Sequence, residues 1–174
     1  MAQRGIKMEM FEYLDLMENK LKGSFNIKRN YSVNNCMYDM FAEYHIRNEK
    51  YVLLKKAVVY SFENNEYCLF KYCENLNRNT VQGIISNLIN SVELIIQPGK
   101  DHMSSIITLI FVTDSILNED LNEITKTISS FSYNKGFAFG FKGWADIRAV
   151  LVSLKEGLIT TNKKGKEVIE VYKF

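Results

Sequence analysis

The sequence predicts one α+β domain in which a mixed, largely antiparallel sheet is flanked by about three helices. Two kinds of apolar spacing alternate along the chain: helical spacing in three segments, and period-two or continuous apolar runs between them. The chain has 174 residues, 47% of them hydrophobic, with one proline. Such a chain is long enough to bury a sizeable core. We therefore expect residues 9–174 to form this single domain and residues 1–8 to be a disordered start.

Three segments have the amphipathic spacing of helices. In residues 9–21, apolar side chains recur on one face while acidic side chains fill the other. Residues 80–96 have the most regular i, i+3, i+4, i+7 pattern, and Asn79 is the expected N-cap. Residues 118–131 begin with acidic side chains, which stabilise the N-terminal turn of a helix.

The remaining segments have spacing typical of strands. The expected strands are residues 25–33, 36–47, 51–62, 66–73, 106–113 and 136–141. Asparagine-containing pairs at 34–35, 48–49 and 64–65 mark the turns of a four-strand antiparallel meander. Residues 147–154 fit either a strand or a helix, and their β-branched content favours the strand. The tail, residues 162–174, is expected to form a basic turn followed by a short helix or an edge strand.

Composition excludes several classes of protein. A net charge of +2 is low for a strong binder of polyanions. The longest apolar runs, such as residues 106–112, fall well short of the roughly 20 residues that span a membrane. The first residues lack the pattern of a signal peptide. Three cysteines without a C-x-x-C pair favour reduced thiols. We expect a cytoplasmic protein that does not bind membranes.

Polar side chains concentrate on one face of the expected strand 36–47. Because side chains alternate along a strand, the odd positions share a surface. These positions include Asp39, Glu43, His45 and Arg47. Acid–base or metal chemistry is conceivable there, but we favour a solvated face with a few ion pairs. The spacing of metal-ligand residue types is unspecific, and we expect no metal and no cofactor.

The order of elements is also similar to the restriction-nuclease-like core. Those enzymes hold Mg²⁺ over a phosphate with an Asp on one strand and a Glu-x-Lys or Asp-x-Lys on the next. Here Asp39 would supply the first acid and Lys71 the lysine. The motif is broken, because the position two before the lysine is Leu69 and Glu66 would point to the other face. An inactive relative of similar fold is therefore favoured over an active nuclease.

Residues 135–141, with the sequence KGFAFGF, resemble the first half of an RNA-recognition-motif signature, in which strand aromatics stack on bases. Residues 110–114 resemble the second signature of that family. Positions 140 and 142 depart from the pattern. In addition, only residues 132–134 separate the expected helix from residue 135, which is too short for the strand that precedes this signature in the family. The favoured interpretation is that three aromatic side chains form the core face of a strand: Phe137, Phe139 and Phe141. Binding of nucleic acid is possible in sequence terms but disfavoured.

Two single residues are further candidates. His102 lies near a Pro-Gly turn, with Ser104 and Ser105 close by, but no G-x-S-x-G motif supports a hydrolase. We favour a histidine that caps a loop by hydrogen bonding. Trp144, the single tryptophan, stands at the start of an expected strand and would form a pocket floor or pack on a turn. We favour packing.

A family resemblance rests on three stretches of the chain. They are NEKYVLLKKAVVYSFENNEY (48–67), HMSSIITLIFV (102–112) and GFAFGFKGWADIRAVLVSLKEGLITTNKKGKE (136–167). Together they resemble a bacterial family of unknown function from low-GC Gram-positive organisms. The resemblance implies a free-standing cytoplasmic domain and carries no activity, cofactor or catalytic residue.

The sequence therefore predicts a non-enzymatic cytoplasmic binding or protein-interaction module. A homodimer through an exposed strand or aromatic surface is a candidate assembly. The alternatives are a nucleic-acid-acting protein and a small-molecule hydrolase around His102 or the polar strand face. Exposure of Phe137, Phe139 and Phe141 beside Lys135 and Lys142 would favour nucleic acid, and their burial would disfavour it. Convergence of Asp39, Glu43 and Lys71 within about 5 Å in a cleft would favour a nuclease.

Overall fold

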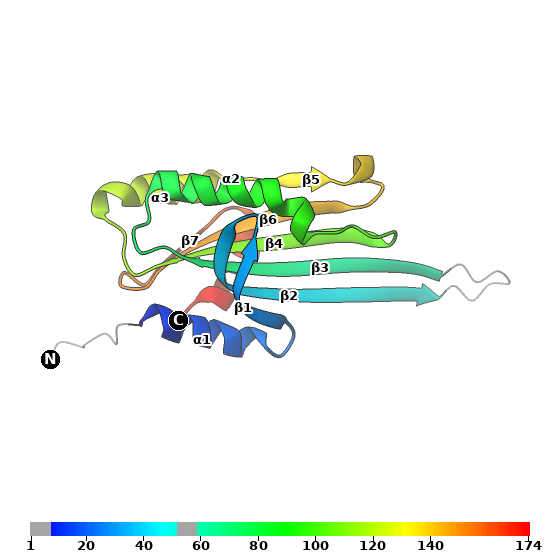
Figure 1. The fold of residues 1–174 in the computed structure, drawn as a ribbon, viewed down its shortest axis with the longest axis horizontal. Coiled ribbons are helices and arrows are strands. Elements are labelled where there is room, and N and C mark those ends of the chain that lie inside the picture. The colour runs from blue at the N-terminus through cyan, green and yellow to red at the C-terminus, as the bar shows by residue number, and fades with distance from the viewer. Residues whose placement is uncertain (1–7, 52–58) are drawn as a thin grey trace.

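The described residues form a seven-stranded mixed sheet with α-helices on both faces (Figure 1). The computed structural model describes the backbone of residues 8–51 and 59–174, and the side chains of residues 8–46 and 63–174. Apart from Met8, the expected disordered start lies outside the described residues, and so does the side chain of Arg47. The predicted α+β class, with a mixed sheet and three flanking helices, is confirmed.

The sheet is built around one buried central strand. The strands are β1 (Asn26–Val33), β2 (Cys36–Tyr51), β3 (Val59–Tyr72), β4 (His102–Thr113), β5 (Asn134–Gly136), β6 (Trp144–Ser153) and β7 (Leu158–Thr161). Their order is β1-β2-β3-β4-β6-β5, and β7 also pairs with β6. β4 runs parallel to both β3 and β6, and the other pairs are antiparallel. The continuous apolar run of β4 is explained by cover on both faces.

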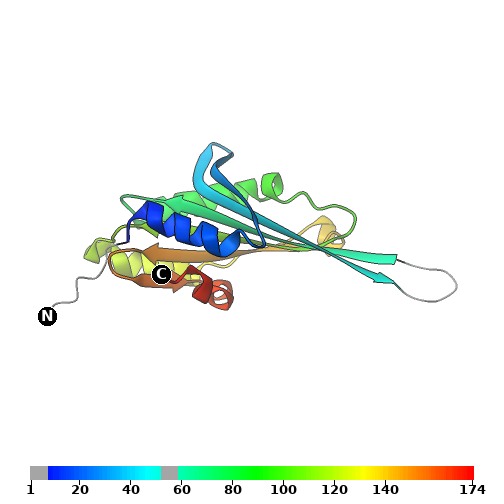
Figure 2. The same ribbon diagram turned by 90° about the horizontal axis from the view of Figure 1, so that it is seen from below.

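The helices divide the core into two layers. α2 (Arg78–Ile95) and α3 (Asn118–Ser130) cover one face, and α1 (Met10–Leu21) covers the other together with the C-terminal turns (Figures 1 and 2). Odd-numbered side chains in the middle of β3, β4 and β6 pack under α2 and α3, and even-numbered ones pack toward α1. A register shift in the β3–β4 pairing moves His102 out of this alternation, onto the α2/α3 face.

Two expected turns are not turns. β2 continues through residues 48–49, and β3 continues through Asn64 and Asn65, so the predicted four-strand meander has three strands. Ser104 Oγ donates to Asn64 Oδ1 at 2.6 Å, and Asn65 Nδ2 donates to Ser105 Oγ at 3.4 Å. Because β4 satisfies these amide side chains, the turn preference of asparagine is overridden by tertiary hydrogen bonds.

The predicted strand at 136–141 is wrong. β5 ends at Gly136, and a single 3₁₀ turn follows at Ala138–Gly140. The φ angles of Ala138, Phe139 and Gly140 are +47°, +56° and +90°, in the left-handed region. A chain in that region cannot continue a strand. The alternation of Phe with small residues is therefore not a period-two core pattern.

Other boundaries differ in smaller ways. Asn77, rather than Asn79, caps α2, because its Oδ1 accepts a hydrogen bond from the backbone nitrogen of Thr80 at 2.9 Å. The ambiguous segment 147–154 lies in strand β6, as favoured. In the tail, the basic segment Lys164–Glu167 and the following Ile169–Tyr172 each form a short 3₁₀ helix, so the short helix is found rather than the edge strand. Strand β7 was not predicted at all.

Asn162 ties the sheet to the tail. Its Oδ1 accepts hydrogen bonds from the backbone nitrogens of Ala149 (3.1 Å) and Gly165 (2.9 Å). Its Nδ2 donates to the carbonyl oxygens of Ile147 (3.1 Å) and Phe131 (3.2 Å). The residue is buried. One amide group thus satisfies backbone groups of β6, of the segment after α3 and of the first C-terminal turn.

We expect Asn162→Ala to lower the free energy of unfolding by about 3 kcal/mol, because it leaves several buried backbone groups without partners. Urea denaturation measures this change. Asn122→Ala is the matched control, since Asn122 is exposed on α3 and should change stability by less than about 0.5 kcal/mol. Equal stabilities of the two variants would contradict the structural role of Asn162.

Candidate functional site

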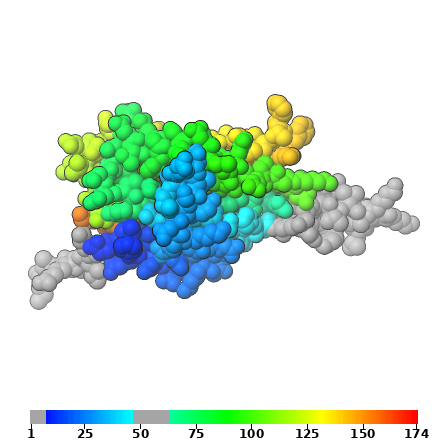
Figure 3. All heavy atoms as spheres, viewed as in Figure 1, coloured from blue at the N-terminus to red at the C-terminus, as the bar shows by residue number. Residues whose placement is uncertain are grey.

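The most exposed large apolar side chains of the described residues lie on one loop. Residues 137–143, here called the aromatic loop, connect β5 to β6 and stand out from the surface (gold in Figures 1 and 3). Phe139 and Phe141 have relative exposures of 103% and 90%. Phe137 is buried instead, at 6%. The three aromatic residues proposed from sequence therefore divide into two exposed rings and one buried ring.

Backbone hydrogen bonds close the aromatic loop on itself. The nitrogen of Phe137 donates to the carbonyl of Gly143 at 2.9 Å, and the nitrogens of Gly140 and Lys142 donate to the carbonyl of Phe137 at 2.9 and 3.1 Å. Gly143 has φ +75°, and a Cβ built there would overlap the backbone of Met103. A side chain is therefore excluded at Gly143 both by its conformation and by the space available.

His102, at the start of β4, anchors the aromatic loop to the sheet. Its Nδ1 lies 2.6 Å from the carbonyl oxygen of Lys142. Because a carbonyl can only accept, Nδ1 carries a proton, and in the tautomer that is protonated only there Nε2 accepts from the hydroxyl of Ser105 at 2.8 Å. The imidazole also meets the Phe137 ring edge-on, with 5.6 Å between centroids. Both partners of the imidazole are fixed, so His102 serves the loop as the sequence suggested, by hydrogen bonding.

Ser105 also belongs to a row of hydrogen-bonded polar side chains that crosses the sheet. Asn65 Nδ2 donates to Ser105 Oγ, and Asn65 Oδ1 accepts from His45 Nδ1 at 2.7 Å. His45 Nε2 lies 3.6 Å from Glu43 Oε2. We call Glu43, His45, Asn65, Ser105 and His102 the polar row. It joins both histidines of the chain, and the strand register places His45, Asn65 and Ser105 directly opposite one another.

The polar row lacks the features of a hydrolase site. Ser105 has no exposed surface, so its hydroxyl cannot reach a substrate in this conformation. A backbone carbonyl, not a carboxylate, holds Nδ1 of His102. Burial raises the pKa of Cys68 and of Cys73 to about 11, which leaves both as poorly nucleophilic thiols at neutral pH. Within the described ranges, no group of three or more His, Cys, Asp and Glu side chains is arranged to hold a metal ion.

The nuclease constellation, which the broken motif already disfavours, does not assemble. Asp39 lines a hollow beside α1 and accepts from the backbone nitrogen of Tyr72 at 2.7 Å. Lys71 donates to the carbonyl of Met37 at 2.8 Å. Glu43 lies on the α2/α3 face, 3.2 Å from Lys28. The three groups therefore have separate local partners.

The prediction that Asp39 shares a face with Glu43 and His45 is wrong because strand alternation breaks near Asp39. Tyr38 packs in the core under α2 and α3, whereas Met40 packs toward α1. Opposite this point, Asn30 of β1 has φ +54°. Left-handed backbone in a strand interrupts its regular pleat. Glu43 and His45 do lie together, as expected.

Trp144 and Arg148 occupy the α1 face of β6. Trp144, at 42% exposure, lies in register with Ser104 of β4 and is only partly packed. Arg148 is buried, 3.0 Å from Glu167 and 3.7 Å from Glu66, and its Nε has no partner. Arg148 is recognisable from the sequence as an unusual residue, because a cation seldom lies within an apolar strand.

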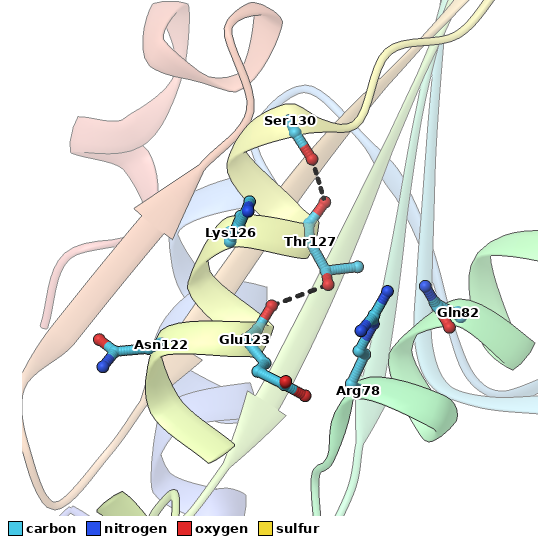
Figure 4. A pocket seen from close by; sticks show the side chains of 7 residues that line it. All are labelled: Arg78, Gln82, Asn122, Glu123, Lys126, Thr127 and Ser130. Carbon is cyan, nitrogen blue, oxygen red and sulfur yellow. Dashed lines mark hydrogen bonds between the residues drawn. The ribbon is translucent and has the colours of Figure 1, made fainter. Parts of the chain in front are cut away.

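A second hollow lies between α2 and α3 (Figure 4). It has a volume of about 360 Å³ and a polar lining: Arg78, Gln82, Asn122, Glu123, Lys126, Thr127 and Ser130. The hydroxyls of Thr127 and Ser130 donate to helix carbonyls of α3, as the dashed lines show. Its charged side chains are exposed, so this hollow is a solvated groove rather than a built site.

One of the comparisons with known proteins finds a family. The family model described as Domain of unknown function (DUF8052) matches residues 9–174. Searches against curated proteins and against solved structures find no match. Across the described part of the chain, no helix has the length and apolar character needed to cross a membrane.

We expect Gly143→Ala to destabilise the protein more than Gly140→Ala. Both residues have positive φ, but an added methyl group meets the backbone of Met103 only at Gly143, and open space surrounds Gly140. Overpacking of this kind costs about 2 kcal/mol beyond the conformational strain that both variants share. Urea denaturation of the two variants gives the difference, and equal losses would show that the aromatic loop is not packed against β4.

We expect His102→Ala to increase amide hydrogen exchange in residues 137–143 at least tenfold, because the carbonyl of Lys142 and the ring of Phe137 both lose their partner. Exchange followed by mass spectrometry measures the effect. His45→Ala is the control, since its exposed ring touches no residue of the loop in the described contacts. Unchanged exchange in His102→Ala would contradict the anchoring role of His102.

Proposed function

The chain belongs to this domain family of unknown function, and we propose that it is a non-enzymatic protein-interaction module that binds its partner through the aromatic loop. We place it in the cytoplasm of low-GC Gram-positive bacteria. A reducing compartment is supported by the three cysteines, all of which are free. The bacterial origin rests on the sequence resemblance.

One observation carries the proposal: two phenylalanine rings are almost completely exposed on a loop that His102 anchors through a hydrogen bond. Leaving two large apolar rings in water costs free energy that burial in a partner recovers. Aromatic side chains are also the residues that dominate binding energy at protein interfaces. A loop fixed by His102 and Gly143 loses little conformational entropy on binding, which favours affinity.

A protein partner is favoured over nucleic acid because the aromatic platform is incomplete. Phe137 is turned into the core, and the residues of β4 that resemble the second RNA-binding signature, Ile110 and Phe111, are fully buried. Stacking on successive bases requires exposed rings on adjacent strands. The net charge of +2 adds little attraction for phosphates.

The non-enzymatic assignment is supported by how the reactive groups are used. His102 and Ser105 bond each other and the loop, and Asp39 and Lys71 bond backbone groups of the sheet. Each of these four groups thus has a local structural partner. Binding through an apolar surface requires none of them.

The proposal is tested by placing the photo-crosslinking residue p-benzoylphenylalanine at position 139, at position 141 and, as a control, at Phe11 of α1, which is also well exposed. We expect irradiation of cells that make the protein to give discrete adducts from positions 139 and 141, because both rings contact the partner. Position 11 should give none. Equal adduct patterns at all three positions, or none at any, would refute binding through the aromatic loop.

A further inference from the structure

We propose that the partner of the aromatic loop is a second copy of this chain, joined by two-fold symmetry, with an exposed phenylalanine of each copy seated in a hollow of the other. This inference rests on the proposed function. It adds the identity of the partner and the position of its acceptor site.

The acceptor is a hollow of about 410 Å³ between the C-terminal end of α2 and the aromatic loop. It is lined by Glu93, Ile96, Gln97, Pro98, Phe137 and Lys142. Ile96 and Phe137 are buried and form an apolar base, and Gln97 is exposed at the margin. The hollow is largely open to solvent, and its volume is large enough to admit a phenyl ring from the surface.

The exposed rings and the hollow belong to one continuous patch. Phe137 and Lys142 line the hollow and are also part of the loop that carries Phe139 and Phe141. The chain's own Phe139 does not fill the hollow, since that ring is fully exposed. A two-fold interface requires a surface that contains both a projection and its complement. A projecting ring beside an apolar hollow meets that requirement.

The charges at the rim are complementary under the same symmetry. Glu93 lies on α2 and Lys142 on the loop, and both border the hollow. When two copies meet face to face, the Lys142 of each approaches the Glu93 of the other. Glu93 Oε1 already lies 2.7 Å from Lys135 of its own chain, but a carboxylate accepts several hydrogen bonds.

Sedimentation equilibrium over about 1 to 200 μM of the full chain tests self-association, a range that covers the affinities of small interfaces. We expect a concentration-dependent dimer. Phe139→Ser/Phe141→Ser, which removes the rings, and Gln97→Trp, which fills the hollow without touching the rings, should each weaken dimerisation at least tenfold. Phe11→Ser should dimerise like the unchanged chain. A monomer throughout the range, or dimerisation unaffected by either variant, would overturn the inference.

Crosslinking identifies the contact and separates this inference from the proposed function. A 1:1 mixture of ¹⁵N-labelled and unlabelled chains, each with p-benzoylphenylalanine at position 139, is irradiated and digested. We expect crosslinked peptides of mixed isotope content that join residue 139 to residues 93–98. Two results would overturn the second copy as partner. The first is that every adduct formed in cells joins the chain to a different protein. The second is that the chain does not dimerise but co-sediments with vesicles of phosphatidylglycerol and phosphatidylcholine. In the first case, binding through the loop would still stand.

Discussion

The hydrogen bond from His102 Nδ1 to the carbonyl of Lys142 is the contact on which the candidate site depends. Through it, a buried ring on the central strand fixes the conformation of a loop that would otherwise have few tertiary contacts. The same ring packs on Phe137 and accepts from Ser105, which places the loop at the end of a polar row that crosses three strands. Buried polar groups with all partners satisfied define one conformation, and here that conformation keeps two phenyl rings in solvent.

The fold could be predicted where local pattern and tertiary packing agree. The helical spacing of α1, α2 and α3 and the apolar run of β4 follow directly from burial against the sheet, and each element lies close to its predicted place. Prediction failed where a tertiary contact overrules local preference. Asn64 and Asn65 continue β3 because serines of β4 bond their amides. Strand β7 was missed because four residues that pair only with the edge of β6 give too short a pattern.

The candidate site could be predicted only in pieces. His102, Phe139 and Phe141 were each singled out by residue type and position, as were Glu43 and His45. Their arrangement could not be read from spacing, because it depends on a register shift in the β3–β4 pairing and on left-handed backbone angles in the loop. Both features change the face of the sheet on which a side chain lies. The period of two in the sequence therefore no longer predicts that face. The alternating Phe pattern predicts a core face, whereas the structure has one buried and two exposed rings.

The central claim is that the aromatic loop is rigid. Exposed rings on a mobile loop would bind weakly, because the loop would lose conformational entropy on binding. ¹⁵N relaxation tests it most directly. We expect backbone order parameters of about 0.85 for the amides of residues 138–142, equal to those of β4. Values below about 0.6 for the loop, with β4 ordered, would contradict the account.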